Sequence, residues 1–211
     1  KNSPPKMKII YEDENLLAID KPAGVNSDDF EKRIHRLDKD TSGVLLIAKS
    51  DETLEFFQKQ FKEGNVEKKY LALAIGNLKN KEGTIETLLG RSRGDKRKQK
   101  VFLAGDPGAE GKRKAETHYK VLQRFKDYDL IEVEPKTGRK HQIRTHLAYL
   151  GHPLAGDKLY GFKNQPCPKE LKRQFLHASC LKIKMLNGEM KEFKSGLPEE
   201  LEKVLEVLNA K

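Results

Sequence analysis

Alternation of apolar and polar residues constrains the fold of this chain more than any other feature. It is clearest in residues 115–125 and 128–135, which only a short turn separates. Because successive side chains of a strand point to opposite faces, this pattern predicts two paired antiparallel strands with one buried face. Further strands are expected from shorter apolar segments: two within 7–25 that a turn at 12–15 separates, then 43–50, 68–76, 176–185 and 189–195.

Helical patterns are fewer than strand patterns, and they occur at 50–64, 138–151 and 198–211. Ser50 or Asp51 can cap the first of these helices, and Gly64 ends it. Asn187–Gly188, between the last two strands, is typical of a tight hairpin turn. Strands that outnumber helices, without regular alternation between the two, favour an α+β fold over a doubly wound sheet.

The chain is strongly basic, since 42 Lys and Arg against 32 Asp and Glu give a net charge of +10 over 211 residues. A basic surface favours a polyanionic partner, because each cation near a phosphate releases counterions; a solvated surface without a partner is the alternative. No apolar run is long enough to cross a bilayer. Cys167 and Cys180 match neither a disulfide framework nor a metal spacing, which indicates a reducing, cytoplasmic compartment.

Asp38 lies in the segment "HRLDKDTSG", residues 35–43, at the entrance to an apolar strand. A carboxylate on such a loop is held rigidly and yet can be reached by a ligand. Its neighbours Arg36 and Lys39 favour the ionised form, which can act as a nucleophile or as a base. On the residues alone, a carboxylate that caps the turn at 41–43 is the more common interpretation.

A second charged segment contains Arg139, His141, Arg144 and His146, on or beside the helix expected within 138–151. The two histidines are five residues apart and lack the zinc-binding pattern, so no metal site is expected. Arg144 and His141 are three residues apart, which would place them on one face of a helix.

The apolar face of that helix is expected to hold Ile143, Leu147 and Leu150. Burial of this face brings Arg144 to the edge of the core. A buried arginine needs a carboxylate partner, because an unpaired buried charge is expensive. Asp38 is the natural candidate.

Two other features admit both a structural and a functional interpretation. Tyr70, in the strand at 68–76, either packs in the core or offers an aromatic platform to a base. Residues 91–114 form a polar hairpin or loop with a basic face, which suits contact with phosphates rather than reading of bases. The cations expected there are Arg91, Arg93, Arg97 and Lys98.

Four segments together resemble the RluA-type pseudouridine synthases, in the same order and with similar spacing. They are "HRLDKDTSG" from His35, "KKYLALAIG" from Lys68, "GRKHQIRTHLAYLGHPLAGDKLYG" from Gly138 and "FLHASCLKI" from Phe175. The resemblance implies an α+β catalytic core, a mostly antiparallel mixed β-sheet flanked by helices and loops, as a single domain over 1–211. Many relatives carry an N-terminal S4 RNA-binding domain, which this chain is too short to hold before its core.

The resemblance also implies roles for single residues. Asp38 matches the catalytic aspartate, Tyr70 the tyrosine that stacks on the target base, and Arg144 the arginine that pairs with the aspartate. Arg36 matches a position that helps to displace the base, and Leu176 an apolar wall of the base pocket. His35, Arg139 and His141 belong to the same motifs and are expected to contact the substrate.

The implied reaction converts uridine within an RNA to pseudouridine, by cleavage of N1–C1′ and formation of C5–C1′. It gains or loses no electrons, so neither a redox cofactor nor a metal is expected. Asp38 could attack C1′ or abstract a sugar proton, and both routes stay open. The substrate is expected to be ribosomal RNA of the large subunit, with transfer RNA as the alternative, and the protein to be a cytoplasmic monomer.

Two rival functions would use the same residues. One is an inactive RNA-binding or chaperone protein on the same fold, against which the presence of Asp38, Tyr70 and Arg144 argues. The other is a nuclease or phosphotransferase that uses Asp38 and Asp40 with a divalent metal. One departure from the family is a short segment of ten residues, 25–34, before "HRLD", which leaves the local fold at 26–30 open.

Overall fold

The computed structural model describes residues 7–210, which divide into two compact units. Unit 1 contains the described residues up to Lys68 together with His177–Leu197. Unit 2 contains Lys69–Leu176 and the described residues from Pro198 onward. The single domain expected over 1–211 stays a prediction, and residues 1–6 and 211 lie outside the described part. No helix within 7–210 is long and apolar enough to span a membrane.

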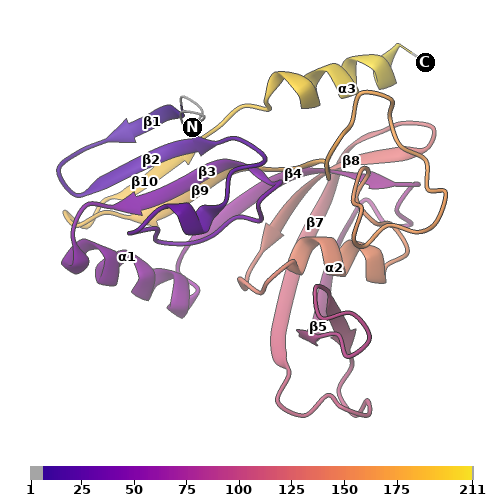
Figure 1. Cartoon of the computed structure of the whole chain (residues 1–211), viewed down its shortest axis with the longest axis horizontal. Helices are drawn as coiled ribbons and strands as arrows, with labels where there is room; N and C mark the ends of the chain where they lie inside the picture. Colours follow the sequence, from indigo (N-terminus) through magenta and orange to yellow (C-terminus); the bar gives the residue numbers. More distant parts are fainter. Residues whose placement is uncertain (1–6, 211) are drawn as a thin grey trace. The chain divides into compact units, whose positions relative to one another are not determined.

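Unit 1 is a mixed sheet with one α-helix (Figure 1). Its strand order is β1-β2-β3-β9-β10, and all neighbours are antiparallel except β3 and β9, which pair in parallel at Ser42–His177 and Gly43–Ala178. A short 3-10 helix occupies Ser27–Asp29, where the sequence left the local fold open. The elements are β1 (Lys8–Glu12), β2 (Leu16–Lys21), β3 (Ser42–Ala48), α1 (Asp51–Glu63), β9 (Leu176–Lys184) and β10 (Met190–Lys194).

Local side-chain chemistry explains where these elements begin and end. The Asp13 carboxylate accepts the backbone N–H groups of Asn15 and Leu16, at 2.8 and 2.7 Å, and so closes the turn expected between β1 and β2. Ser50, rather than Asp51, caps α1, since its hydroxyl accepts the N–H of Thr53 at 3.1 Å. Both predictions of an element boundary are confirmed.

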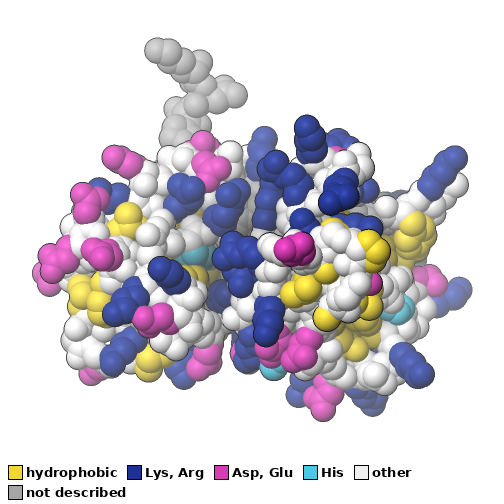
Figure 2. Space-filling view, turned by 90° about the horizontal axis from the view of Figure 1, so that it is seen from below, with side chains coloured by type: hydrophobic (Ala, Val, Ile, Leu, Met, Phe, Trp, Pro, Cys, Tyr) yellow, Lys and Arg dark blue, Asp and Glu magenta, His cyan; other side chains and the backbone are white. Residues whose placement is uncertain are grey.

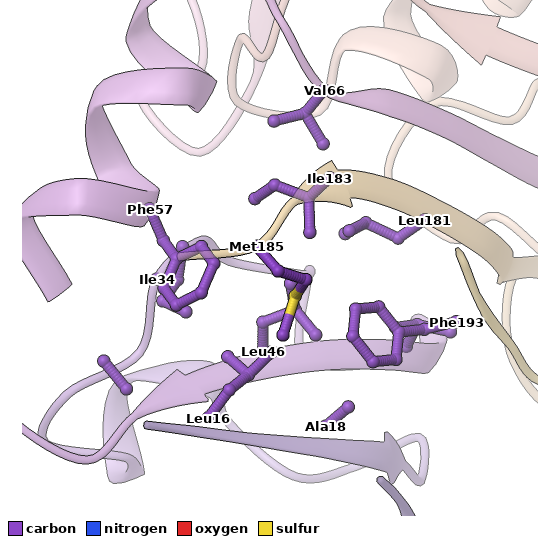
Figure 3. Close-up of a cluster of buried hydrophobic side chains, with 12 residues drawn as sticks. Leu16, Ala18, Ile34, Leu46, Phe57, Val66, Leu181, Ile183, Met185 and Phe193 are labelled. Carbon is purple, nitrogen blue, oxygen red and sulfur yellow. The ribbon is translucent and has the colours of Figure 1, made fainter. Parts of the chain in front are cut away.

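The core of unit 1 lies between α1 and the curved sheet (Figure 3). Phe57 of α1 packs there with Leu16 of β2, Leu46 of β3, Ile183 of β9 and Phe193 of β10. These side chains are almost completely buried. Strands from two distant parts of the chain therefore share one core.

Unit 2 is an antiparallel sheet with two helices (Figure 1). Its strand order is β4-β8-β7-β5-β6, and the expected pairing of residues 115–125 with 128–135 is confirmed by β7 and β8. The predicted α+β class and mostly antiparallel mixed sheet are confirmed. The elements are β4 (Glu67–Ile75), β5 (Glu82–Arg91), β6 (Gln99–Phe102), β7 (Arg113–Arg124), β8 (Tyr128–Pro135), α2 (Gln142–Tyr149) and α3 (Glu199–Asn209).

Helix α2 packs on the core of unit 2 through Ile143 and Leu147, as the sequence predicts. Leu150 does not join them, because the helix ends at Tyr149 and Leu150 is 36% exposed. Its place on the apolar face was predicted from helical spacing, which no longer applies beyond the last turn. Helix α3 begins after Pro198 and buries Leu201 and Val204.

Candidate active site

Asp38 lies on a loop whose flanking residues are fixed by hydrogen bonds. The buried Ser27 hydroxyl donates to the Leu37 carbonyl at 2.9 Å and accepts the Leu37 N–H at 3.0 Å. On the other side, the Gly24 N–H donates to the Lys39 carbonyl at 2.9 Å. The backbone on both sides of Asp38 is therefore held in place, and its side chain remains partly exposed.

Lys21 stabilises the same loop through hydrogen bonds of its side chain. Its side chain is completely buried, and its ammonium donates to the carbonyls of Pro22, Val25 and Lys39 at 2.9, 2.8 and 3.0 Å. An ammonium has three N–H donors, and these bonds use each of them. Lys21 thus ties the segment after β2 to the residue that follows Asp38.

His35 and Arg36 differ sharply in their surroundings. The His35 ring stacks on Phe61 with centroids 4.8 Å apart, and its Nε2 accepts the Leu46 N–H at 3.1 Å. Burial, with the charge of Lys68 nearby, lowers the pKa of His35 to about 3, so the ring is neutral at physiological pH. Arg36 has a side chain that is 56% exposed and lies 3.9 Å from Asp28, so it can reach a ligand.

Arg144 is buried in unit 2 and forms a bidentate ion pair with Asp157. Its Nε and Nη2 donate to the two carboxylate oxygens at 2.7 and 3.0 Å. The same carboxylate accepts the N–H groups of Leu159 and Tyr160. Burial would raise the pKa of Asp157, but the hydrogen bonds and charge of Arg144 outweigh it, so this pKa lies below its usual value.

The expected carboxylate partner of Arg144 therefore exists, and within unit 2 it is Asp157. Sequence analysis named Asp38 instead, which belongs to unit 1. The pairing of Arg144 with Asp38 would join the two units and stays a prediction. What the ion pair with Asp157 establishes is that the guanidinium has a fixed orientation before any substrate binds.

Tyr160 connects Arg144 to two other parts of unit 2. Its ring lies over the guanidinium at 5.1 Å, and its hydroxyl accepts the Gln99 N–H at 2.7 Å. The same hydroxyl is 2.8 Å from Nδ1 of His141. His141 has a left-handed backbone, with φ of 54°, so α2 begins at the next residue. The prediction that His141 and Arg144 share a helix face is wrong for this reason.

Arg139 also precedes α2, and it binds the edge of the sheet. Its Nε donates to the Lys114 carbonyl at 2.9 Å. Burial, together with the nearby charge of Arg113, lowers the pKa of Arg139. Arg139 thus lies beside the basic strands of unit 2, in a place where added negative charge is favourable.

Tyr70 and Leu176 meet at one apolar cluster of unit 2. Leu176 is a buried member of the cluster that includes Ile143 and Leu147 of α2, and Tyr70 packs against it from β4. The structure thus brings the proposed stacking residue, the proposed pocket wall and the helix of Arg144 together. That arrangement can hold a flat ring beside an oriented guanidinium.

The predicted phosphate-binding cations lie at the end of β5 and in the turn to β6. Arg91 and Arg93 are exposed. Arg97 closes on Asp95 through Nε and Nη2 at 3.0 and 2.8 Å, which lowers the pKa of Asp95 to about 2. Figure 2 shows Lys and Arg side chains gathered on the face of unit 2 toward which β5 projects in Figure 1.

A cavity of about 390 Å³ in unit 1 contains none of these candidates. It lies at the other end of β2 and β3 from Asp38, and Phe57, Met185 and Met190 line it with turn residues. The arrangement of side chains, rather than cavity size, therefore identifies the site.

Comparison with known proteins assigns the family. Residues 15–149 match the model of the RNA pseudouridylate synthase family. This chain belongs to that family. Ribosomal large subunit pseudouridine synthase D of Borreliella burgdorferi is 37% identical over 90% of the chain and 65% of its own length. Ribosomal large subunit pseudouridine synthase C of Vibrio vulnificus is 35% identical, over 95% of the chain and 69% of its own length. The predicted RluA-type resemblance and enzyme class are confirmed.

A solved pseudouridine synthase domain has the same fold. Human RNA pseudouridylate synthase domain containing 1 matches all of this chain and 98% of its own, with a TM-score of 0.79 and 27% identity. An RNA pseudouridine synthase of Bacillus subtilis is 34% identical over 97% of the chain and 74% of its own length. An RNA pseudouridine synthase of Chloroflexus aurantiacus is 41% identical over 83% of the chain and 52% of its own length.

Four residues that support the pseudouridine synthase motifs escaped the sequence analysis. They are Lys21, Ser27, Asp157 and Tyr160. Asp157 and Tyr160 lie in the quoted family segment that begins at Gly138, but neither residue was assigned a role. A carboxylate shortly after an arginine-bearing helix was the available signal. Lys21 begins the segment "KPAG", which resembles a motif of the family, but the sequence assigned the lysine no role. A single serine in a polar loop carries no pattern at all.

Proposed function

We propose that this chain converts uridine to pseudouridine in structured RNA, with ribosomal RNA of the large subunit as the substrate. The names of the relatives from Borreliella burgdorferi and Vibrio vulnificus support this choice of RNA. The observation that carries the catalytic assignment is the loop of Asp38, whose neighbours Leu37 and Lys39 are fixed by side chains and backbone of unit 1. Preorganisation of this kind is what a reacting carboxylate needs.

In the proposed mechanism Asp38 acts at the sugar. Two routes are open to it. In the first, Asp38 attacks C1′ as N1–C1′ breaks, and C5 of the turned uracil then displaces the carboxylate from the ester. In the second, Asp38 removes a sugar proton as N1–C1′ breaks, which gives a glycal, and returns that proton when C5 bonds to C1′. In both routes C5 then loses its proton and N1 gains one. Tyr70 stacks on the uracil, and Arg144, oriented by Asp157, donates hydrogen bonds at the site. Arg36 helps to hold the displaced base outside its stack, a displacement that costs a few kcal/mol.

The cations of the β5–β6 turn offset that cost through phosphate contacts. Arg91 and Arg93 are the exposed candidates, while Lys98 is partly buried and Arg97 is already paired with Asp95. Arg139 and His141 lie beside them, before α2. His35, neutral and stacked on Phe61, would contribute by positioning the loop of Asp38. The protein would work in the cytoplasm, as a monomer and without a metal.

The decisive experiment is carbodiimide-probed primer extension on unmodified large-subunit ribosomal RNA and transfer RNA, with and without a chelator. The wild type would be compared with Asp38→Asn and with Asp40→Asn, a matched change at an exposed carboxylate two residues away. We expect stops with the wild type and Asp40→Asn, and none with Asp38→Asn at unchanged RNA affinity.

Each other result has a definite meaning. Stops on transfer RNA alone would replace the proposed substrate. Turnover by Asp38→Asn would remove the catalytic assignment. Binding without stops in the wild type would favour an inactive RNA-binding protein, and loss of activity in chelator alone would favour a metal-dependent reaction.

A further inference from the structure

A three-stranded ribbon at one end of unit 2 has two chemically distinct faces. We call residues 88–114 the arm; it contains the end of β5, β6 and the start of β7. Leu88 pairs with Phe102 on one side and Lys114 on the other, and Gly90 pairs with Lys100. Side chains of directly paired residues lie on the same face of a sheet, as do those at i and i+2. These five residues therefore share one face.

The opposite face of the arm is turned toward α2. Thr87, which precedes the arm on β5, lies on that face, and its hydroxyl is 2.9 Å from His146 of α2. Leu89 and Arg113 are paired on the same face, and so is Arg91. The face with Gly90 thus points away from α2 and from Arg144. We call it the outer face.

Two lysines converge on the outer face. The ammonium of Lys100 lies 5.4 Å from the centre of the Phe102 ring, and that of Lys112 lies 5.3 Å from the same centre. Gly90 makes room for this arrangement, since a Cβ on Gly90 would come within 2.3 Å of Cδ of Lys112. The Lys112 side chain therefore lies over β5 at Gly90, where the strand has no side chain.

The charge of this pair is uncompensated by neighbouring carboxylates. Among residues 7–210 no Asp or Glu lies within ion-pair distance of Lys100 or Lys112. The acidic residues of the same face are Glu86 and Glu116. They lie opposite each other in the β5–β7 ladder, further along the strands from the two lysines. Two cations held on one aromatic ring repel each other, and binding of an anion removes that repulsion.

We propose that Lys100 and Lys112 bind the phosphodiester backbone of folded RNA on the outer face of the arm. This inference rests on the proposed function. It adds a contact between the outer face and a second backbone strand of the RNA. Arg91, Arg113 and Arg139 supply cations on the side of α2. An arm with cations on both faces fits between two backbone strands of a folded RNA, whereas a single strand or a flat anionic membrane contacts one face at a time.

The test compares two double variants that lose the same charge. Lys100→Gln/Lys112→Gln removes the pair, and Lys79→Gln/Lys81→Gln removes two exposed lysines just before β5, at its other end. Binding of an RNA stem-loop and of an unpaired polyuridine strand with equally many phosphates would be measured over a range of salt concentrations. Anionic phosphatidylserine vesicles serve as a third ligand.

For the stem-loop, we expect the Lys100/Lys112 variant to lose about tenfold in affinity and its salt slope to fall by about one to two, as for one or two lost phosphate contacts. The control variant should match the wild type. Polyuridine should bind both variants alike, and Lys100→Arg/Lys112→Arg should restore stem-loop binding.

Three results would overturn the inference: an unchanged salt slope on the stem-loop, an equal loss on polyuridine, or a loss confined to vesicles. The stability of each variant in urea shows that a loss does not come from unfolding. The outcome is independent of catalysis. A changed slope without pseudouridine formation would keep the outer-face contact and remove the proposed reaction.

Discussion

At the scale of single residues, the Ser27 hydroxyl does much to hold the loop of the candidate active site in place. Ser27 bonds both backbone polar groups of Leu37, the residue before Asp38. Sequence patterns located Asp38 but not this support, because a serine in a polar loop has no periodicity to reveal it. The same holds for Asp157, which pairs with Arg144 across a turn whose geometry no spacing rule predicts.

Ser27→Ala should lower kcat for pseudouridine formation by about 10- to 100-fold with little change in RNA affinity, because a small displacement of Asp38 is costly. It should also destabilise by about 1–3 kcal/mol, since two buried backbone groups lose their partner. Single-turnover assays and urea unfolding measure both. Ser50→Ala is the matched control: it loses the cap of α1, costs about 1 kcal/mol and should leave kcat unchanged. Equal kcat values for the two variants would show that Ser27 supports the fold but does not position Asp38 for catalysis.

Asp157→Ala should destabilise by about 3–5 kcal/mol, because it removes a buried carboxylate that accepts two hydrogen bonds from the Arg144 guanidinium. Arg144→Met in the same chain should recover most of that loss, as it removes the buried positive charge as well. A double-mutant cycle in urea measures the coupling between the two positions. Simple additivity of the two changes would show that Arg144 finds an equally good partner elsewhere.

At the scale of elements, sequence patterns performed well where periodicity is strong. The pairing of β7 with β8, the turn between β1 and β2 and the limits of α1 follow from alternation and capping chemistry. The start of α2 did not follow, because the backbone of His141 is left-handed, with φ of 54°, and its ring is engaged by Tyr160. Long-range contacts override local propensity there.

The parallel contact between β3 and β9 depends on Gly43. Its φ is 117°, and a Cβ there would lie 2.2 Å from the carbonyl oxygen of Ala178. Gly43→Ala should therefore destabilise by more than about 3 kcal/mol, because the two strands must separate. Gly64→Ala, at a positive φ with open space around it, should cost only about 1 kcal/mol. The urea midpoints of the two variants measure these losses in stability. Similar losses for both variants would mean that β9 can move away from residue 43 at little cost.

At the scale of the whole molecule, buried neutral histidine links stability to pH. His146 is 0% exposed and lies between the hydroxyls of Thr117 and Thr87, and burial lowers its pKa to about 4. Unfolding returns this pKa to about 6.5. The unfolded chain therefore binds an additional proton between these values, and stability falls as the pH falls through this range.

The free energy of unfolding should accordingly decrease below about pH 6.5, with a slope that approaches about 1.4 kcal/mol per pH unit for His146. His146→Asn should flatten this part of the profile, whatever its effect at pH 7. Urea titrations at several pH values between neutrality and about pH 4 measure the slope. An identical slope in the variant would assign the effect to other groups, His35 among them.

The division of unit 1 between two distant stretches of chain has a consequence for synthesis. Strands β2 and β3 and helix α1 leave the ribosome early, but β9 and β10 follow only after every strand of unit 2 has been made. Until then Leu16, Leu46 and Phe57 lack the side chains of Ile183 and Phe193 that bury them. Unit 2, whose strands are contiguous in sequence, can complete its sheet first. The nascent chain thus carries an incomplete unit 1 while all the strands of unit 2 are translated, and the apolar side chains left exposed during this interval favour aggregation.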